Sequence, residues 1–387
     1  MTEWKEYKFS DFIDINPLVR IPKNIPISFV EMKDLDPSMR YCESSQLKLL
    51  SGGSRFINGD TLFARITPCL ENGKICQVRN LQNNVGFGST EFHVLRGKEG
   101  VSDTNFVYYL SRWNEVRDHA EHNMEGSSGR QRVPKEAFDT LYLPLPPLPE
   151  QIRIASILSS LDDKIDLLHR ENKTLEAMAE TLFRQWFIEE AKEDWEDNPL
   201  GKCIKLVGGG TPKTSEERFW NGNVFWLSGG DIANNHKSFV SSSVKSISED
   251  GLNNSSAKLL PENAMVISAR GTVGKYCLLS KPMAFSQSNY GILPIYNDCY
   301  FFTYLLVAYH IDELQSAAYG SVFDTITTKT FEGVSVLIPK ETSYIVEFEK
   351  MIDPYFSKMK QNNKQIQTLI QQRDSLLPKL MSGEVKI

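Results

Sequence analysis

A long helical pattern lies in the middle of the chain. From Pro149 to about Glu190 the apolar residues recur in alternating steps of three and four, which keeps them on one helical face. Asn172 is the one polar residue on this face. Residues 146–192 are therefore predicted to form a helix roughly 60 Å long, at ~1.5 Å per residue, as a spacer between two globular parts. The apolar face consists of Ile154, Leu158, Leu161, Ile165, Leu168, Leu175, Ala179, Leu182 and Trp186.

A second pattern of the same kind closes the chain, in residues 339–387. The two faces can pair antiparallel in a register that places Asn172 opposite Asn362. A buried Asn pair fixes the register of two helices at some cost in stability, so this pair is predicted to set it. The second apolar face consists of Ile345, Phe348, Ile352, Tyr355, Met359, Ile366, Leu369, Leu376 and Leu380.

Three features count against a regular helix pair. The same register places Leu161 opposite Arg373, an unfavourable match of an apolar and a charged side chain. Pro354 and Pro378 lie within the second pattern, and proline removes a backbone donor from a helix. The second helix is therefore predicted to be kinked or shortened.

The regions before and after the central helix, residues 1–145 and 193–338, resemble each other. Each is predicted to be a mixed domain of short strands with one helix, and the same motifs recur in the same order. Ala64-Arg65 ends a strand in the first region, and Ala269-Arg270 ends its counterpart. The predicted fold is thus α+β: two similar mixed α/β domains separated by a pair of long antiparallel coiled-coil helices, with pseudo-two-fold symmetry.

Composition limits the class of protein and the cellular compartment that can be expected. A chain of 387 residues with 41% hydrophobic content can bury two cores. It has no apolar run of membrane-spanning length, its first residues are charged, and its six cysteines form no Cys-x-x-Cys pair. A cytoplasmic protein with reduced thiols is expected. The net charge of −6 argues against non-specific coating of nucleic acid, although it permits a local basic groove.

No catalytic motif is complete. Residues 208–214 are glycine-rich but miss the spacing of a phosphate loop, so a flexible surface turn is predicted. His119 and His122 have no third metal ligand and are predicted to be solvated. Residues 353–356 lack the second proline of a methyltransferase loop, and residues 71–74 are typical of a hairpin turn. The sequence therefore predicts a protein that is not an enzyme.

Polar residues that suit DNA recur in both domains. Arginine donates two hydrogen bonds to guanine edges or to phosphate, and short hydroxyl and amide side chains suit base and backbone contacts. Arg65 and Arg270 each end a predicted strand, and a glycine-serine loop in each domain is expected to be an adaptable reading loop. The predicted DNA-binding residues are Arg65, Ser89, Thr90, Ser127, Ser128, Arg130, Arg132, Lys213, Arg270, Gln287, Ser288, Asn289, Ser321 and Lys329.

The whole chain resembles the specificity subunit of a type I restriction–modification system. Five stretches carry the resemblance: the Gly-Asp-Thr-Leu-Phe-Ala strand before Arg65, the two Gly-Ser loops at Gly126 and Gly320, the Leu-Pro-Pro-Leu-Pro-Glu-Gln segment ending at Gln151, and the Leu-Leu-Pro-Lys-Leu-Met-Ser-Gly-Glu tail ending at Glu384. The second domain lacks the proline-rich Glu-Gln entry to its helix.

The resemblance implies two target-recognition domains, each reading one half of a bipartite double-stranded DNA target, with the helices setting the gap. It implies two adenine methyltransferase subunits and motor-nuclease subunits as partners. S-adenosylmethionine, ATP and magnesium would belong to those partners, with no cofactor in this chain, and base flipping would occur in the methyltransferase.

Two alternatives stay open at this point. The chain could be the specificity part of another methylation-linked endonuclease assembly, which co-purifying subunits would reveal. It could also be a helical scaffold with two protein-binding domains, which the absence of salt-dependent DNA affinity would favour. The bases of the two half-sites do not follow from the sequence.

Overall fold

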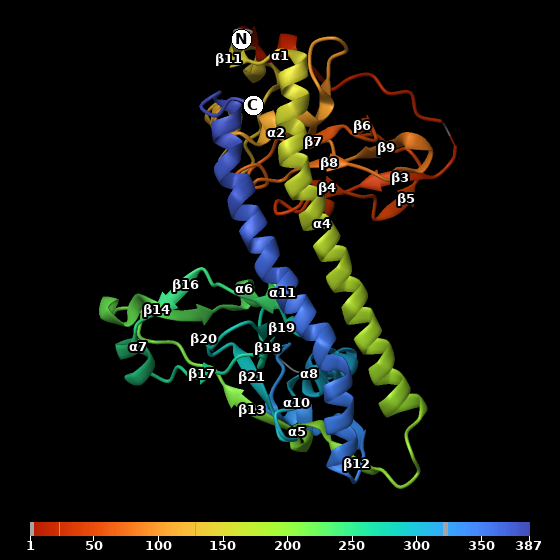
Figure 1. Cartoon of the computed structure of the whole chain (residues 1–387), viewed down its shortest axis with the longest axis vertical. Helices are drawn as coiled ribbons and strands as arrows, with labels where there is room; N and C mark the ends of the chain where they lie inside the picture. The colour runs from red at the N-terminus through yellow and green to blue at the C-terminus, as the bar shows by residue number, and fades with distance from the viewer. Residues whose placement is uncertain (1–3, 23, 128, 320–323) are drawn as a thin grey trace. The chain divides into compact units, whose positions relative to one another are not determined.

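The computed structural model describes residues 4–22, 24–127, 129–319 and 324–387 (Figure 1). The chain forms two compact units, one of Met1–Leu168 with Ile366–Ile387 and the other of His169–Gln365. Each unit combines one mixed α/β domain, which we call a head, with parts of both long helices. The first head has its two main sheets among residues 13–97, and the second among residues 204–294.

The first head contains two sheets and a short strand pair (Figure 1). One sheet has the order β2-β10-β7-β8-β4 and the other β5-β3-β9-β6, while β1 pairs with β11. Buried phenylalanine and tyrosine side chains fill the core. The strands are β1 Lys5–Lys8, β2 Ile13–Ile15, β3 Ile27–Val30, β4 Tyr41–Cys42, β5 Gln46–Lys48, β6 Ser54–Ile57, β7 Thr61–Ala64, β8 Ile75–Val78, β9 Val85–Gly88, β10 Phe92–Gly97 and β11 Tyr142–Leu145. The helices are α1 Phe9–Phe12, α2 Thr104–Arg112 and α3 Asn114–His122, with 3-10 turns η1 Met32–Asp34, η2 Gln82–Asn84 and η3 Lys135–Thr140.

The second head repeats this topology. Its sheets have the orders β13-β21-β18-β19-β15 and β16-β14-β20-β17, and β12 pairs with β22. The strands are β12 Glu196–Pro199, β13 Ile204–Gly208, β14 Trp220–Leu227, β15 Phe239–Val240, β16 Lys245–Ile247, β17 Leu259–Leu260, β18 Met265–Ser268, β19 Tyr276–Leu279, β20 Met283–Phe285, β21 Asn289–Pro294 and β22 Ser335–Ile338. The helices are α5 Leu200–Cys203, α6 Gly229–Asn234, α7 Glu249–Asn253, α8 Tyr300–Tyr309, α9 Ile311–Tyr319 and α10 Thr328–Glu332, with the 3-10 turn η5 Glu217–Phe219.

The predicted single helix of each head is broken in two. In the first head α2 ends before Trp113, whose backbone is extended with ψ 138°, and α3 follows. In the second head α8 ends before His310 and α9 follows. Propensity alone did not show these breaks, because the residues at both points are compatible with a helix.

The alignment of the two heads differs from the predicted one by one residue. In the structure Ala64 pairs with Phe92 on β10, whereas Ser268 pairs with Asn289 on β21. The turns before these strands agree, because Gly59 donates to the carbonyl of Val78 as Asn263 donates to that of Leu279. Ala64 is thus equivalent to Ser268, so the predicted match of Arg65 with Arg270 is wrong. Arg65 is equivalent to Ala269, and the shared Ala-Arg dipeptide misled the sequence alignment.

The long helices are α4 Leu148–Arg184, followed by the π turn η4 Gln185–Glu189, and α11 Thr342–Met381. They have 37 and 40 residues. Helix α11 continues through Pro354 and Pro378, so the predicted shortening is wrong. Pro354 is exposed while Ile352 and Phe356 on either side of it are buried. This packing offsets the backbone hydrogen bond that Pro354 cannot donate.

Within the second unit the helices meet at the asparagine pair expected from the register. The Asn362 amide donates to Asn172 Oδ1 at 2.8 Å and to Glu171 Oε2 at 2.9 Å. The Asn172 amide donates in turn to Asn363 Oδ1 at 2.8 Å. Ile352 and Met359 are buried nearby in sequence, and Leu175 is partly buried.

Within the first unit the two long helices contact each other through apolar side chains and through a buried ion pair. Ile154 and Leu158 join the core of the first head, and Ile165, Leu168 and Ile366 form a small cluster with Leu369. Leu161 is half-buried, and Arg373 pairs with the neighbouring Asp162 instead, at 2.8 Å. The unfavourable match predicted for Leu161 is thereby avoided, because the arginine turns toward the carboxylate.

Candidate nucleic-acid interface

The glycine-serine loop of the first head is the tip of an anchored hairpin. Glu125 and Arg132 exchange two backbone hydrogen bonds of 2.9 Å, and the Val133 amide donates to the carbonyl of Arg65 at 2.8 Å. Thr67 ties the same stem by bonding the backbone of Gln131 twice. The stem is therefore rigid, so the expectation of an adaptable loop applies to the tip alone.

Three segments of the first head converge at this hairpin. The Arg65 amide donates to the carbonyl of Glu91 at 3.0 Å, which joins the end of β7 to the turn before β10. The Glu91 amide is held by Ser89 Oγ at 3.1 Å. Arg132 on the hairpin stem pairs with the Glu91 side chain, its Nη2 lying 2.7 Å from Oε1. The three joined segments carry five of the predicted DNA-binding residues: Arg65, Ser89, Thr90, Arg130 and Arg132.

The predicted residues of the first head differ in exposure. Thr90, Ser127 and Arg130 are exposed, and Ser89 is half-buried. Arg65 is half-buried, and its Nε is buried without a hydrogen-bond partner among the described residues. The Arg130 amide donates to the carbonyl of Ser127 at 3.0 Å, which shapes the hairpin tip. Ser128 lies outside the described residues.

Two groups in the first head were not expected from the sequence. Glu91 forms a salt bridge with Arg132 and raises the pKa of that guanidinium through their hydrogen bond. His93 is buried, with Nε2 2.9 Å from the carbonyl of Val133, and burial lowers its pKa to about 4. His93 is therefore neutral near pH 7 and braces the hairpin stem. The position of Glu91, directly after the predicted DNA-binding residues Ser89 and Thr90, could have indicated its role from the sequence. Nothing in the sequence indicated the role of His93.

The same three-way junction recurs in the second head. The Ala269 amide donates to the carbonyl of Ser288 at 3.0 Å, and the Ile326 amide donates to the carbonyl of Ala269 at 3.1 Å. These bonds correspond to those that join Arg65 with Glu91 and Val133. Arg270 and Gln287 are exposed at this junction, and Ser288 is half-buried. Lys329 is exposed on α10, which begins two residues after Ile326.

The position of Asn289 differs from the predicted one. It was predicted to lie on the DNA-facing surface, but its side chain is buried and donates to Ser286 Oγ at 2.8 Å. Asn289 is the first residue of β21, where pairing with Ser268 turns its side chain inward. The buried Asn289 Oδ1 has no hydrogen-bond partner among the described residues. Ser321 of the second glycine-serine loop lies outside those residues.

The glycine-rich segment at Lys213 is not a flexible turn. A Cβ on Gly210 would lie 2.2 Å from the backbone of Ser256, so only glycine allows this close approach. The indole nitrogen of Trp226 donates to the carbonyl of Gly210, and that of Trp220 to the carbonyl of Lys213, at 2.9 and 3.1 Å. The Lys213 side chain is exposed at the end of this packed segment.

Other kinds of site are not found in the described ranges. No group of His, Cys, Asp and Glu in the described residues is placed to hold a metal ion. No helix in those residues is long and apolar enough to cross a membrane. His119, predicted to be solvated, instead lies with Nε2 2.9 Å from the carbonyl of Ala137 and fixes α3 to the following turn.

Comparison with known proteins places the chain in a family. The model of the type I restriction modification DNA specificity domain matches residues 1–177 and 192–371, once for each head with its following helix. The HindI specificity subunit of Haemophilus influenzae is 26% identical over 471 aligned positions, covering 100% of both chains. The MjaIX specificity subunit of Methanocaldococcus jannaschii is 25% identical, covering 75% of this chain and 71% of its own.

A solved structure has the same fold. The S subunit of a type I restriction–modification system from M. genitalium aligns over 98% of this chain and 96% of its own, with a TM-score of 0.54 and 16% identity. The duplicated heads, the pair of long helices and the two matches to the family model agree with one another. The chain belongs to the type I restriction–modification DNA specificity family, as a non-catalytic DNA-recognition subunit.

Proposed function

We propose that each head reads one half of a bipartite double-stranded DNA target, and that the helix pair sets the unread gap between the halves. The observation that carries this proposal is the three-way junction described above, which recurs in both heads. In each head it gathers polar residues from the end of a core strand, from the turn before the next strand and from a segment after the helices. Such convergence on a rigid scaffold suits a reading surface, because loops carry contacts and the sheet holds them in place.

The asparagine pair supports the role of the helices as a ruler. A spacer measures a distance only if its two helices cannot slide by a heptad, and a polar pair among apolar neighbours prevents such sliding. Asn172 and Asn362 bond each other directly, while their neighbours Glu171 and Asn363 complete the group. The register is thus held by hydrogen bonds that any other register would break.

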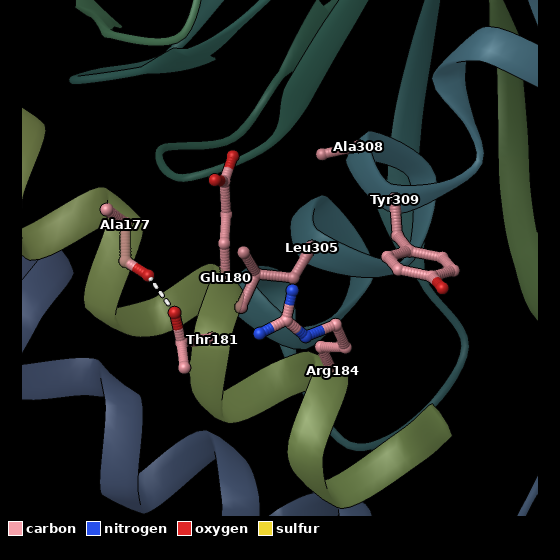
Figure 2. Close-up of a pocket in the computed structure, with 7 residues that line it drawn as sticks. All are labelled: Ala177, Glu180, Thr181, Arg184, Leu305, Ala308 and Tyr309. Atoms are coloured by element: carbon pink, nitrogen blue, oxygen red, sulfur yellow. Dashed lines mark hydrogen bonds between the residues drawn. The ribbon is translucent and has the colours of Figure 1, made fainter. Parts of the chain in front are cut away.

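We propose that the partners are two adenine methyltransferase subunits, joined by motor-nuclease subunits for cleavage. Support comes from a groove that recurs at the same place in both units. In the second unit it lies between α4 and α8, has a volume of about 350 Å³ and is lined by Glu180, Arg184 and Tyr309 among others (Figure 2). In the first unit it lies between α11 and the α2–α3 junction, with Trp113, Arg117 and Asp374. A repeated groove fits two copies of one partner.

The cofactors belong to those partners in this proposal. Transfer of a methyl group to adenine requires S-adenosylmethionine, and translocation with cleavage requires ATP and Mg²⁺. The residues of this chain supply recognition, and the partner subunits bind the cofactors and flip the target base.

Methylome sequencing tests the proposal in a host that carries this chain with its methyltransferase subunits. We expect a motif of two short specific halves separated by a gap of fixed length. Lengthening α4 and α11 by one heptad each at matched positions should widen the gap and leave both halves unchanged. A motif without a gap, or a half-site that changes with helix length, would contradict the separate roles of heads and helices. Methylation by this chain without partners would contradict the assignment of chemistry to the methyltransferase.

A further inference from the structure

The Arg132 guanidinium on the first head is held along one edge. Its Nε lies 3.0 and 2.9 Å from the two carboxylate oxygens of Glu91, and its Nη2 lies 2.7 Å from Oε1. On the other side its Nη1 donates to the carbonyl of Arg130 at 3.2 Å. The backbone of Glu91 is itself fixed just before β10, because its amide donates to Ser89 Oγ and its carbonyl accepts from the Arg65 amide.

The free donors of Arg132 form a defined pair. A guanidinium carries five N–H groups, one on Nε and two on each terminal nitrogen. The contacts with Glu91 and Arg130 occupy one on each nitrogen, so one donor on Nη1 and one on Nη2 have no partner among the described residues. The side chain is 42% exposed, so these donors can reach solvent. Two donors on adjacent nitrogens match O6 and N7 of guanine in the major groove.

We propose that Arg132 reads a guanine in the half-site of the first head, and that Glu91 is the positioning residue that orients it. This inference rests on the proposed function, because it requires the hairpin surface to face DNA. Glu91 removes the rotational freedom of a long side chain before binding, so less entropy is lost when the base contact forms.

The charge of Glu91 favours a base over a phosphate as the target. A carboxylate in contact with the guanidinium repels a phosphate, whereas guanine O6 and N7 are neutral acceptors. Arg130 at the hairpin tip is exposed and carries the phosphate contact, where a flexible cation is adequate. The two arginines therefore have different roles although they are two residues apart.

In the second head uncharged residues stand at the two positions equivalent to this pair. By the hydrogen bonds of the junction, Glu91 is equivalent to Ser288 and Arg132 to Thr325. Neither residue is charged, so the second head must read its half-site with other groups, Arg270 and Gln287 among them. The second half-site is thus an internal control for changes at Arg132 and Glu91.

The test compares methylomes of complexes assembled with wild-type chain and with the variants Arg132→Lys, Glu91→Gln and Arg96→Lys. Arg132→Lys keeps the charge but loses the paired donors, so discrimination at one G·C position should fall roughly 10- to 100-fold. Glu91→Gln keeps the shape and one acceptor oxygen, so the same position should relax by a smaller factor. Arg96→Lys is the matched control, since Arg96 forms the same edge-on pair with Asp60 near the far end of β10. Its motif should equal that of the wild type.

Each other outcome overturns the proposal. An unchanged motif in both Arg132→Lys and Glu91→Gln, or an equal loss at all sequences, would assign Arg132 to the phosphate backbone or to stability. Relaxation at an A·T position, or in both half-sites, would contradict the guanine contact. A wild-type complex that methylates no bipartite motif would instead contradict the proposed function. This failure differs from failure of the Arg132 proposal because it occurs without any substitution. If Arg132→Lys lowers the yield of assembled complex, the motif of the Glu91→Gln variant alone tests the proposal.

Discussion

In the first unit the head is joined to the long helices by buried charges, and in the second by stacked aromatic rings. Asp162 of α4 pairs with Arg373 of α11 at 2.8 Å and accepts a hydrogen bond from Tyr109 of the head at 2.7 Å. Asp166, one turn further along α4, accepts two from Arg79. Asp162 and Arg373 are both buried, so water does not compensate for either charge.

The second unit uses ring contacts at the corresponding place. Phe301 of α8 stacks on Phe356 of α11 with centroids 4.4 Å apart and planes 3° from parallel. Phe187 packs against Phe302 and Phe348, each at 4.9 Å. Polar contacts accompany the rings; in one of them the Tyr304 hydroxyl of α8 donates to Glu176 of α4 at 2.8 Å.

The difference shows that one architecture can be held together by two kinds of interaction. Buried charges are strongly directional and costly to leave unpaired, whereas aromatic clusters gain from area and tolerate small displacements. We infer that each head fits its own segment of the helix pair. The buried charges of the first unit would be left unpaired against the aromatic surface of the second.

The largest effect is expected from Arg373→Ala, which leaves Asp162 buried without its partner. The first unit should lose about 3–5 kcal/mol of stability, because an uncompensated buried charge is costly. Hydrogen exchange should locate the loss in α2 and in residues 366–381. Replacing both Asp162 and Arg373 by Leu is the control and should restore most of the stability. A single-variant cost near that of an exposed pair, below about 1 kcal/mol, would show that the charges are not the main tie.

Lowering the pH from about 8 to 4.5 should raise the free energy of unfolding of the second unit through Glu349, whereas the matched site of the first unit should make no such contribution. Glu349 of α11 accepts hydrogen bonds from the amides of Phe301 and Phe302 at the start of α8. Burial raises its pKa to about 7. Because the folded state holds the proton more tightly than the unfolded one, this stabilising contribution is present at low pH and is lost as pH rises through about 7. It amounts to on the order of 2–3 kcal/mol.

The matched site in the first unit carries no such charge. There Gln151 Oε1 accepts from the Asp103 amide at the start of α2, at 2.9 Å. Glu349→Gln should therefore flatten the pH dependence of the second unit between pH 4.5 and 8, measured by unfolding in urea at several pH values. A slope that is the same in wild type and variant would show that another group is responsible.

A smaller effect is expected from Phe348→Leu in the aromatic cluster. The substitution keeps a similar volume but removes edge-to-face contacts with Phe187, so the second unit should lose roughly 1–2 kcal/mol. Met351→Leu on an exposed face of the same helix is the control and should change stability by less than about 0.5 kcal/mol. If the two variants behave alike in thermal unfolding, ring geometry contributes little to this unit.

The smallest effect on stability is expected when both Asn172 and Asn362 are replaced by Leu. Stability should rise by less than about 1 kcal/mol, since Asn362 Oδ1 is buried and has no hydrogen-bond partner among the described residues. The register should become less well defined, so the methylation motif should tolerate more than one gap length. A double variant that keeps a single gap length would show that the surrounding contacts suffice to set the register.

Local patterns determined the larger features of this protein. The three-four spacing located both long helices and placed Asn172 opposite Asn362, because helical periodicity and a single polar residue leave few registers to choose from. The duplicated order of motifs indicated two similar heads. These features depend on residues near each other in sequence, or on patterns long enough to average out local exceptions.

Tertiary contacts decided the rest. The alignment of Arg65 with Ala269 follows from strand pairing, which depends on hydrogen bonds between distant segments and not on a shared dipeptide. The same applies to Asn289, turned inward by β21, and to α11, which continues through Pro354 because its neighbours are packed. Asp162 with Arg373, and Glu91 with Arg132, are pairs formed across long sequence separations. Sequence alone showed which residues could form ion pairs or contact DNA, and the fold determined which of them meet, because burial and orientation arise only when distant segments pack.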